Sequence, residues 1–188
     1  IFWPGPLTII VKKSDYVSSV ISANTEWVSL RSPANETARK LLEYSMVPIV
    51  APSANISGKI TSTYKDHLVN YFKNTDVSIL ADDEPSKIGI ESTIIKIDNV
   101  TVSLVRPGII TLDNIKEDMK DYTGPINYKV CDVYEQAEHP GSSISHYSTN
   151  KNTILFNLVE GSPNMGAVLR PLDSTTPAAI TREDPRPV

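Results

Sequence analysis

The chain has 188 residues, of which 40% are hydrophobic and 21% are charged, and its mean hydropathy is -0.17. These values exclude a disordered chain and a membrane protein, and the length allows one domain with a full core, or one domain and part of another. The formal net charge of -4 and the pI near 5.4 argue against a protein whose main role is non-specific nucleic-acid binding. Cys131 is the single cysteine, which excludes an internal disulfide and is typical of the reducing cytosol.

The first expected elements are two strands and two helices. An apolar run from Leu7 to Val11 follows a Pro-Gly-Pro turn and predicts a strand. Residues 15–21 have a weak helix pattern capped by Ser14, and Trp27 to Leu30 alternates like a strand. A second helix, capped by Asn35, follows with apolar residues at three- and four-residue spacing.

The middle of the chain continues the alternation of strands and helices. Apolar runs from Val47 to Val50 and from Val77 to Leu80 predict two buried strands. Between them, Tyr64 to Phe72 has the spacing of a helix, with N-caps offered by residues 61–63. This succession favours an α/β fold with a twisted, mostly parallel sheet.

The last third begins with a hairpin and ends without a pattern. Ile94 to Ile97 and Thr101 to Val105 are expected to pair as strands, and Thr111 caps a short helix through Met119. Residues 1–122 therefore form the main domain, and residues 123–152 form a linker or lid without regular structure of its own. A strand from Thr153 to Leu158 opens residues 153–188, which are the start of a second domain or a poorly ordered tail.

Two arginines stand at strand ends. Arg31 precedes a Ser-Pro pair and Arg106 precedes a proline, so both are placed to face one anionic ligand. A surface ion pair explains Arg31 equally well. Glu91, Ser92 and Thr93 lie at the mouth of a strand, where their side chains either contribute to a site or satisfy nearby backbone groups.

A polar loop follows the run that ends at Val50. Ser53, Asn55 and Ser57 alternate in it, so their side chains would share one face of an extended segment and suit phosphate or carboxylate oxygens. A simple polar turn is the alternative. The acidic loop at residues 81–85 suits a hydrated Mg²⁺, although clustered carboxylates are more often solvated surface.

Six stretches together resemble the YrdC-like family of threonylcarbamoyl-AMP synthases, and specifically its long members with a linker and a second domain. Each stretch alone is weak, but all six follow the family's order over most of residues 2–147. They are Phe2 to Thr8, Leu30 to Pro33, Ala51 to Gly58 with Thr61 to Thr63, Gly89 to Thr93, Arg106 to Gly108, and Pro140 to Tyr147.

The resemblance implies an enzyme that makes threonylcarbamoyl-AMP and pyrophosphate from L-threonine, bicarbonate or CO₂, and ATP with Mg²⁺. The product would serve tRNA modification at adenosine 37 in the cytoplasm. Such a nucleotidyltransferase acts by positioning and by neutralising charge, so no nucleophilic side chain is expected. The family fold is a YrdC-like open sheet with a positively lined cavity.

The resemblance also assigns residues. It implies that Arg31 pairs with the threonine carboxylate and that Ala51 and Ser92 lie in the same threonine site. It assigns ATP contacts to Ser53, Asn55, Thr61, Arg106 and Tyr147, and a lid contact to His146.

The sequence departs from the family at both ends of the resemblance. The family's N-terminal Lys-x-Arg motif is absent, so we expect the natural protein to begin upstream of Ile1 and this chain alone to have little synthase activity. The linker reads His139-Pro-Gly-Ser142 where the family has Ser-Pro-Gly-Met, which weakens the lid assignments. Two alternatives remain: a non-catalytic module that binds double-stranded RNA or tRNA, disfavoured by the acidic pI, and a YrdC-like domain that handles carbamoyl-adenylate.

Overall fold

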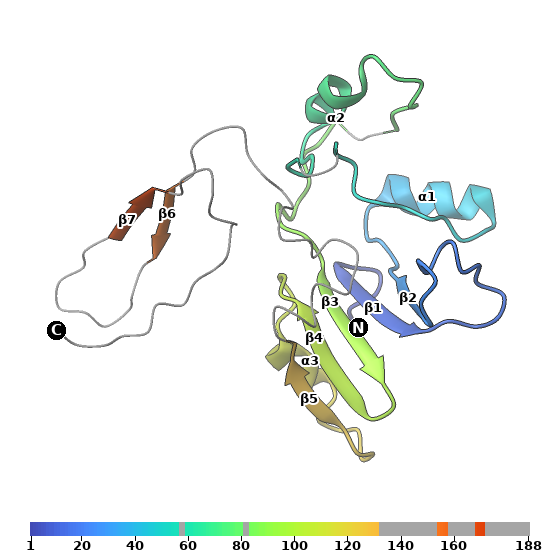
Figure 1. Ribbon diagram of the computed structural model, residues 1–188, viewed down its shortest axis with the longest axis vertical. Helices are drawn as coiled ribbons and strands as arrows, with labels where there is room; N and C mark the ends of the chain where they lie inside the picture. Colours follow the sequence, from blue (N-terminus) through green and yellow to red (C-terminus); the bar gives the residue numbers. More distant parts are fainter. Residues whose placement is uncertain (57–58, 81–82, 132–153, 158–167, 172–188) are drawn as a thin grey trace.

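The computed structural model describes residues 1–56, 59–80, 83–131, 154–157 and 168–171. Its centre is a five-stranded sheet with the strand order β2-β1-β3-β4-β5 (Figure 1). The strands are β1 (Leu7–Lys12), β2 (Trp27–Leu30), β3 (Thr93–Asp98), β4 (Thr101–Arg106) and β5 (Asn127–Val130).

The sheet is mixed. Strands β1 and β3 pair in parallel, as do β4 and β5, whereas β1 with β2 and β3 with β4 are antiparallel. The α/β class is therefore confirmed, and so is the β3–β4 hairpin, whose turn contains Asn99 with a φ of 51°. The parallel pairing of β1 with β3 joins two segments that are far apart in the sequence. It places the starts of both strands side by side, with Leu7 opposite Thr93.

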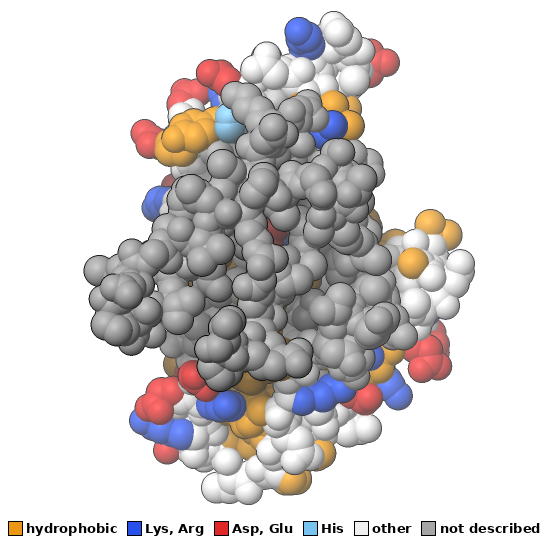
Figure 2. Space-filling model, turned by 60° about the vertical axis from the view of Figure 1, so that its left-hand side comes forward, with side chains coloured by type: hydrophobic (Ala, Val, Ile, Leu, Met, Phe, Trp, Pro, Cys, Tyr) orange, Lys and Arg blue, Asp and Glu red, His pale blue; other side chains and the backbone are white. Residues whose placement is uncertain are grey.

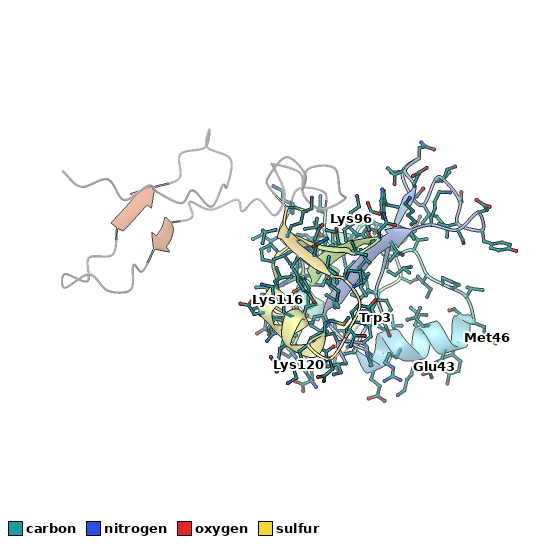
Figure 3. All side chains as sticks on the ribbon, turned by 90° about the horizontal axis from the view of Figure 1, so that it is seen from below. Trp3, Glu43, Met46, Lys96, Lys116 and Lys120 are labelled. Atoms are coloured by element: carbon teal, nitrogen blue, oxygen red, sulfur yellow. The ribbon has the colours of Figure 1, made fainter. Side chains whose placement is uncertain are left out.

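Two clusters of buried side chains lie on opposite faces of the sheet, because neighbouring residues of a strand point to opposite sides. Helix α3 (Leu112–Asp118) covers one face and contributes Ile115 to the first cluster. Figure 3 shows Lys96 on the side of the sheet away from Lys116 of this helix and from Lys120 in the turn that follows it. The first cluster consists of Leu7, Ile95, Ile110 and Ile115, and the second of Ile10, Ile94, Val105 and Cys131 with Trp27 against it.

Three helices were expected from Asn35, Tyr64 and Thr111 onward, and all three are confirmed. Helix α1 (Glu36–Ser45) begins where the Asn35 side chain accepts a hydrogen bond from the Ala38 backbone N–H at 2.8 Å. Helix α3 begins at a capping box between Thr111 and Asn114. Helix α2 (Lys65–Phe72) starts after Tyr64 without a side-chain cap, so the N-caps expected at residues 61–63 were wrong.

Three other expected elements are absent from the described residues. Residues 15–21 form turns rather than a helix. Serine and valine have low helix propensity, so this segment has little to stabilise a helix. Neither apolar run forms a strand: Val47 and Val50 are 61% and 66% exposed, and Val77 and Leu80 are 53% and 65% exposed. Apolar composition alone does not make a strand, because a strand also needs a partner for its backbone.

The described part of the chain after residue 121 contains two strands that sequence patterns missed, β5 and β7 (Val168–Pro171). Strand β5 adds to the edge of β4 in parallel, from Thr101 paired with Asn127 to Leu104 paired with Val130. A separate antiparallel pair joins β6 (Ile154–Asn157), where a strand was expected, to β7, where none was. No helix in the described ranges is long and apolar enough to cross a membrane.

Candidate functional site

The backbone of residues 2–6 joins two strands at one edge of the sheet. The Gly5 N–H donates to the Ser32 carbonyl at 2.8 Å, and the Pro6 carbonyl accepts from the Thr93 N–H at 3.0 Å. A side chain at Gly5 would collide with the carbonyl of Phe2, so glycine is required for this turn. The segment therefore fixes the position of Ser32, the neighbour of Arg31, relative to the start of β3.

A register shift turns Arg106 toward the same edge. Leu104 pairs with Ile95, but Arg106 rather than Val105 pairs with Ile94, so the register moves by one residue between these pairs. Such a bulge lets two successive residues oppose one residue of the partner strand. Val105 can then pack beside Ile94 in the second cluster while Arg106 lies on the side of the sheet where Ser92 points.

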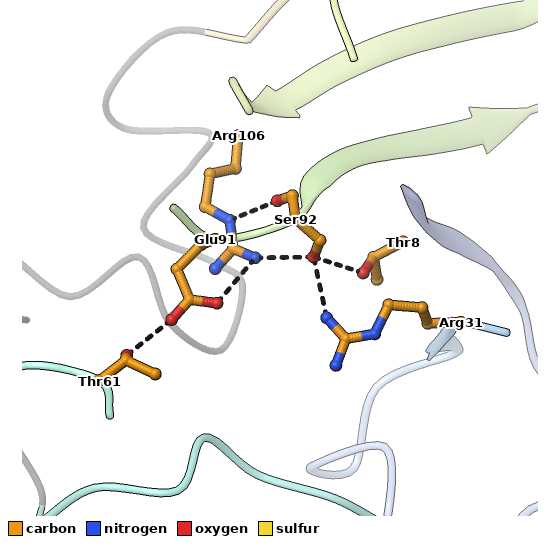
Figure 4. Close-up of polar contacts among 6 residues, drawn as sticks. All are labelled: Thr8, Arg31, Thr61, Glu91, Ser92 and Arg106. Atoms are coloured by element: carbon orange, nitrogen blue, oxygen red, sulfur yellow. Dashed lines mark hydrogen bonds and ion pairs between the residues drawn. The ribbon is translucent and has the colours of Figure 1, made fainter. Parts of the chain in front are cut away.

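Ser92 is the centre of the resulting polar cluster (Figure 4). Its Oγ accepts from Arg31 Nη1 at 3.2 Å and from Arg106 Nη2 at 3.0 Å, and it lies 2.8 Å from Thr8 Oγ1. Arg106 Nε also donates to the Ser92 carbonyl at 3.0 Å. The side chain of Ser92 is buried, with 5% of its surface exposed, so both guanidinium groups meet at a desolvated oxygen.

These contacts decide the direction of the remaining hydrogen bond. A hydroxyl oxygen has two acceptor positions and one proton. Since both acceptor positions of Ser92 Oγ are used by arginines, its proton goes to Thr8 Oγ1. The Thr8 proton and most of the Arg31 N–H groups then have no partner among the described residues, and they are available to an anionic or carbonyl-bearing ligand.

Glu91 closes the cluster on its other side. Its Oε1 accepts from Thr61 Oγ1 at 2.6 Å, and its Oε2 lies 3.8 Å from Arg106 Nη2. The side chains of Glu91 and Arg106 are 29% and 23% exposed. A Cβ at Gly108 would lie 2.8 Å from the Glu91 carbonyl and 2.5 Å from the Thr93 nitrogen, so only glycine lets the chain pass this close.

The polar loop that follows Val50 lies apart from this cluster. Ala51 and Ser53 are exposed, and no hydrogen bond or ion pair within the described residues joins Ser53 or Asn55 to the cluster. The Asn55 amide donates to the carbonyls of Ile56 at 2.9 Å and Lys59 at 3.0 Å. The Asn55 Oδ1 is buried and has no partner in the described part of the chain. In this structure Asn55 therefore shapes the loop, and its nucleotide contact stays a prediction.

The arrangement brings together three of the predicted residues, Arg31, Ser92 and Arg106, and ties Thr61 to them through Glu91 (Figure 4). His146 and Tyr147 lie outside the described residues. Sequence patterns gave no role to Thr8. The signal that could have found it is its polar side chain within an otherwise apolar strand. In the described ranges no group of three or more His, Cys, Asp or Glu residues could hold a metal ion. The Mg²⁺ site considered at residues 81–85 stays a prediction, because residues 81–82 lie outside the described ranges.

Two arginines that meet at a buried hydroxyl on a mixed α/β sheet form an arrangement suited to an anionic ligand. Residues 1–108 match the model of the Sua5/YciO/YrdC family, which carries the description telomere recombination. The chain belongs to this family.

Curated relatives bear the name threonylcarbamoyl-AMP synthase. The one from Pyrococcus abyssi is 38% identical over 164 residues, which is 85% of this chain and 46% of the relative. The one from Bacillus subtilis is 36% identical over 165 residues, 86% of this chain and 45% of the relative. The chain thus spans about half the length of these relatives.

A solved structure is similar along the same part of the chain. The crystal structure of Pyrococcus abyssi Sua5 complexed with L-threonine matches with a TM-score of 0.67 and 38% identity. The match covers 78% of this chain and 43% of the Sua5 chain. The similarity therefore extends to the fold that carries the arginine cluster.

Proposed function

We propose that this chain is part of an L-threonylcarbamoyladenylate synthase, which makes threonylcarbamoyl-AMP and pyrophosphate from L-threonine, bicarbonate or CO₂, and ATP. The observation that carries the proposal is the convergence of Arg31 and Arg106 on Ser92 Oγ, at 3.2 and 3.0 Å. Two guanidinium groups held together without a carboxylate between them repel each other, and an anionic substrate removes that repulsion. The similarity to a Sua5 structure with L-threonine supports threonine as that substrate.

Arg31 is the residue best suited to the threonine carboxylate. One of its N–H groups is used by Ser92, and a guanidinium has enough remaining donors to bind a carboxylate in a bidentate manner. The Thr8 proton, left over once Ser92 donates to Thr8, suits a second oxygen of the bound amino acid. Arg106 would then neutralise charge on the carbamate or on the α-phosphate during adenylation.

The nucleotide is proposed to bind toward Thr61 and the loop of Ser53 and Asn55. The Asn55 amide already donates to two carbonyls, so a phosphate contact requires this loop to rearrange or the phosphate to meet backbone N–H groups instead. Because the described residues offer no cluster of carboxylates, Mg²⁺ would be held by the ATP phosphates and water. The product would serve tRNA modification in the cytoplasm.

Calorimetric titration of the 188-residue chain with L-threonine tests the first step. We expect saturable binding, and we expect Arg31→Ala to weaken it by about a hundredfold, the order of a charge-assisted bidentate contact. Arg39→Ala is the matched control, because Arg39 lies on helix α1 and makes no contact in the cluster.

A segment exchange tests the synthase reaction itself. Residues 1–108 replace the matching part of the Pyrococcus abyssi enzyme, and pyrophosphate release is measured with threonine, bicarbonate and ATP. Threonine-dependent release that Arg31→Ala abolishes would support the proposal. A folded chimera without release, together with a wild-type chain that does not bind L-threonine, would overturn it. Binding of double-stranded RNA in place of threonine would favour the non-catalytic alternative. Among the described side chains visible in Figure 2, however, Lys and Arg are mixed with Asp and Glu and form no continuous basic patch.

A further inference from the structure

The carboxylate of Glu91 is held at one oxygen and faces an arginine with the other. The Thr61 hydroxyl donates to Oε1 at 2.6 Å, which is the length expected for a hydroxyl on a carboxylate. That bond restricts the rotation of the side chain and leaves Oε2 directed at Arg106 Nη2, 3.8 Å away. Both side chains are mostly shielded from water, at 29% and 23% exposure, so their attraction is screened less than at the surface.

The Arg106 guanidinium is fixed along one edge only. Its Nε and Nη2 donate to the carbonyl and the hydroxyl of Ser92, both at 3.0 Å. Its Nη1 has no partner among the described residues and stays available as a donor. Glu91 lies beside the Nη2 side, where its charge favours the orientation in which Arg106 stays on Ser92.

A purely structural role accounts poorly for this geometry. Other ion pairs in the described chain join exposed side chains, whether near in sequence, as Glu117 with Lys120 (73% and 60% exposed), or 18 positions apart, as Lys65 with Asp83 (46% and 89% exposed). The Glu91 carboxylate instead connects residues that are 30 and 15 positions away, and it does so beside the hydroxyl on which two arginines meet. A carboxylate beside an anion-binding site weakens the affinity of the site for an anion, because like charges repel. A role in orienting Arg106 would offset that loss.

We propose that Glu91 is a positioning residue: tethered by Thr61, it holds the Arg106 guanidinium against Ser92 so that the free Nη1 edge faces the anionic substrate. The identity of that substrate rests on the proposed function, but the orientation of Arg106 does not. Two of the three charges in the cluster are positive, so the attraction of Glu91 to Arg106 also offsets part of the repulsion between Arg31 and Arg106 before a ligand binds.

Hydrogen exchange at Arg106 Nε measures this orientation in the absence of any ligand. The Nε–H signal is observed by NMR in the nitrogen-15-labelled chain and assigned by its loss in Arg106→Lys. We expect Glu91→Ala and Thr61→Val to speed its exchange by about tenfold, because a released guanidinium loses its bond to the Ser92 carbonyl for a larger share of the time. Thr61→Ser restores the hydroxyl and should restore slow exchange.

Threonine affinity provides a second readout with a different pattern. Glu91→Gln keeps an oxygen for Thr61 and removes a negative charge beside the anion site, which offsets part of the weaker hold on Arg106, so its L-threonine affinity should stay within about threefold of wild type. Glu91→Ala and Thr61→Val should lose about tenfold, because Arg106 then leaves the Ser92 hydroxyl that it shares with Arg31. Glu117→Gln, in the exposed pair with Lys120, is the matched control and should change neither readout.

The outcomes separate the two proposals. If the wild-type chain does not bind L-threonine and the folded chimera does not release pyrophosphate, the proposed function fails while the exchange data still decide the role of Glu91. If Glu91→Ala lowers the free energy of unfolding but leaves both Nε exchange and threonine affinity unchanged, Glu91 is only structural and this inference is wrong. A Thr61→Ser variant that behaves like Thr61→Val would also contradict it, since the hydroxyl tether would then be irrelevant.

Discussion

The sheet with α3 and the segment that spans residues 36–80 differ in how they are held. The sheet buries side chains on both faces, including Ile10 at 2% and Val105 at 1% exposure. The 36–80 segment contains helices α1 and α2, and none of its described residues is buried (Figure 1). The polar cluster takes Arg31, Ser92 and Arg106 from the sheet side and only Thr61 from the segment.

This difference teaches where the precision of the site comes from. Thr8 and Arg106 belong to β1 and β4, and Arg31 and Ser92 lie one residue outside β2 and β3, so the packed sheet fixes the backbone positions of all four. Thr61 reaches the cluster through a single hydrogen bond to Glu91. The threonine side of the site is therefore expected to be preformed, whereas the nucleotide side depends on a segment with little packing of its own.

The largest expected effect compares two isoleucines. Ile10→Ala removes a side chain with 2% exposure from the second cluster and should lower the free energy of unfolding by about 2–5 kcal/mol. Ile49→Ala removes one with 42% exposure and should change it by less than about 0.5 kcal/mol. Urea denaturation measures both values. Equal losses would mean that the 36–80 segment is packed as well as the sheet.

The next comparison uses two threonines with the same bonding pattern. Thr93 Oγ1 donates to the Ile110 carbonyl at 2.7 Å and accepts from the Ile110 N–H at 3.1 Å. Because Thr93 is fully buried, Thr93→Val should cost about 1–3 kcal/mol through the backbone groups left without partners.

The matched variant is Thr75→Val in the 36–80 segment. Thr75 Oγ1 donates to the Phe72 carbonyl at 2.8 Å and accepts from the Val77 N–H at 3.4 Å, but it is exposed. Water can replace the lost hydroxyl there, so the free energy of unfolding should change by less than about 0.5 kcal/mol. A loss as large as that of Thr93→Val would contradict the contrast between the two regions.

The smallest effect concerns the helix caps. Asn35→Ala and Thr111→Ala each remove a side-chain cap worth about 1 kcal/mol. Helix α1 has no buried residue, so the loss of its cap in Asn35→Ala should appear as faster amide hydrogen exchange within α1 alone. The exchange rates in β1 and β3 should not change. Helix α3 is anchored by Ile115, so Thr111→Ala should instead lower the protection of the whole sheet region. Identical exchange patterns for both variants would refute this distinction.

Sequence patterns predicted most of the sheet and all three helices because each of these elements carries its own periodicity or cap. They failed for the runs at residues 47–50 and 77–80, which have apolar side chains but no paired strand in the described chain. They also missed β5, whose residues look like a loop and become a strand because the edge of β4 offers backbone partners. Local composition contains no information about such partners.

The candidate site was predicted in part for the same reason. Arginines at strand ends are visible in a sequence, so Arg31 and Arg106 were found. The link from Thr61 to Glu91 joins residues 30 positions apart, and only the fold determines that they meet. Asn55 was expected to face a ligand because of its spacing, but its amide has local carbonyl partners that a spacing rule does not consider.

Because the register shifts between β3 and β4, the direction of the Arg106 side chain depends on the number of residues in the hairpin as well as on their chemistry. In a regular hairpin that continues the pairing of Leu104 with Ile95, Arg106 would oppose Thr93 and point to the face covered by α3. A shift of β4 by one residue would therefore move Arg106 away from Ser92 without a change in any side chain. An insertion or deletion in this hairpin could therefore remove Arg106 from the site as completely as a substitution of the arginine itself.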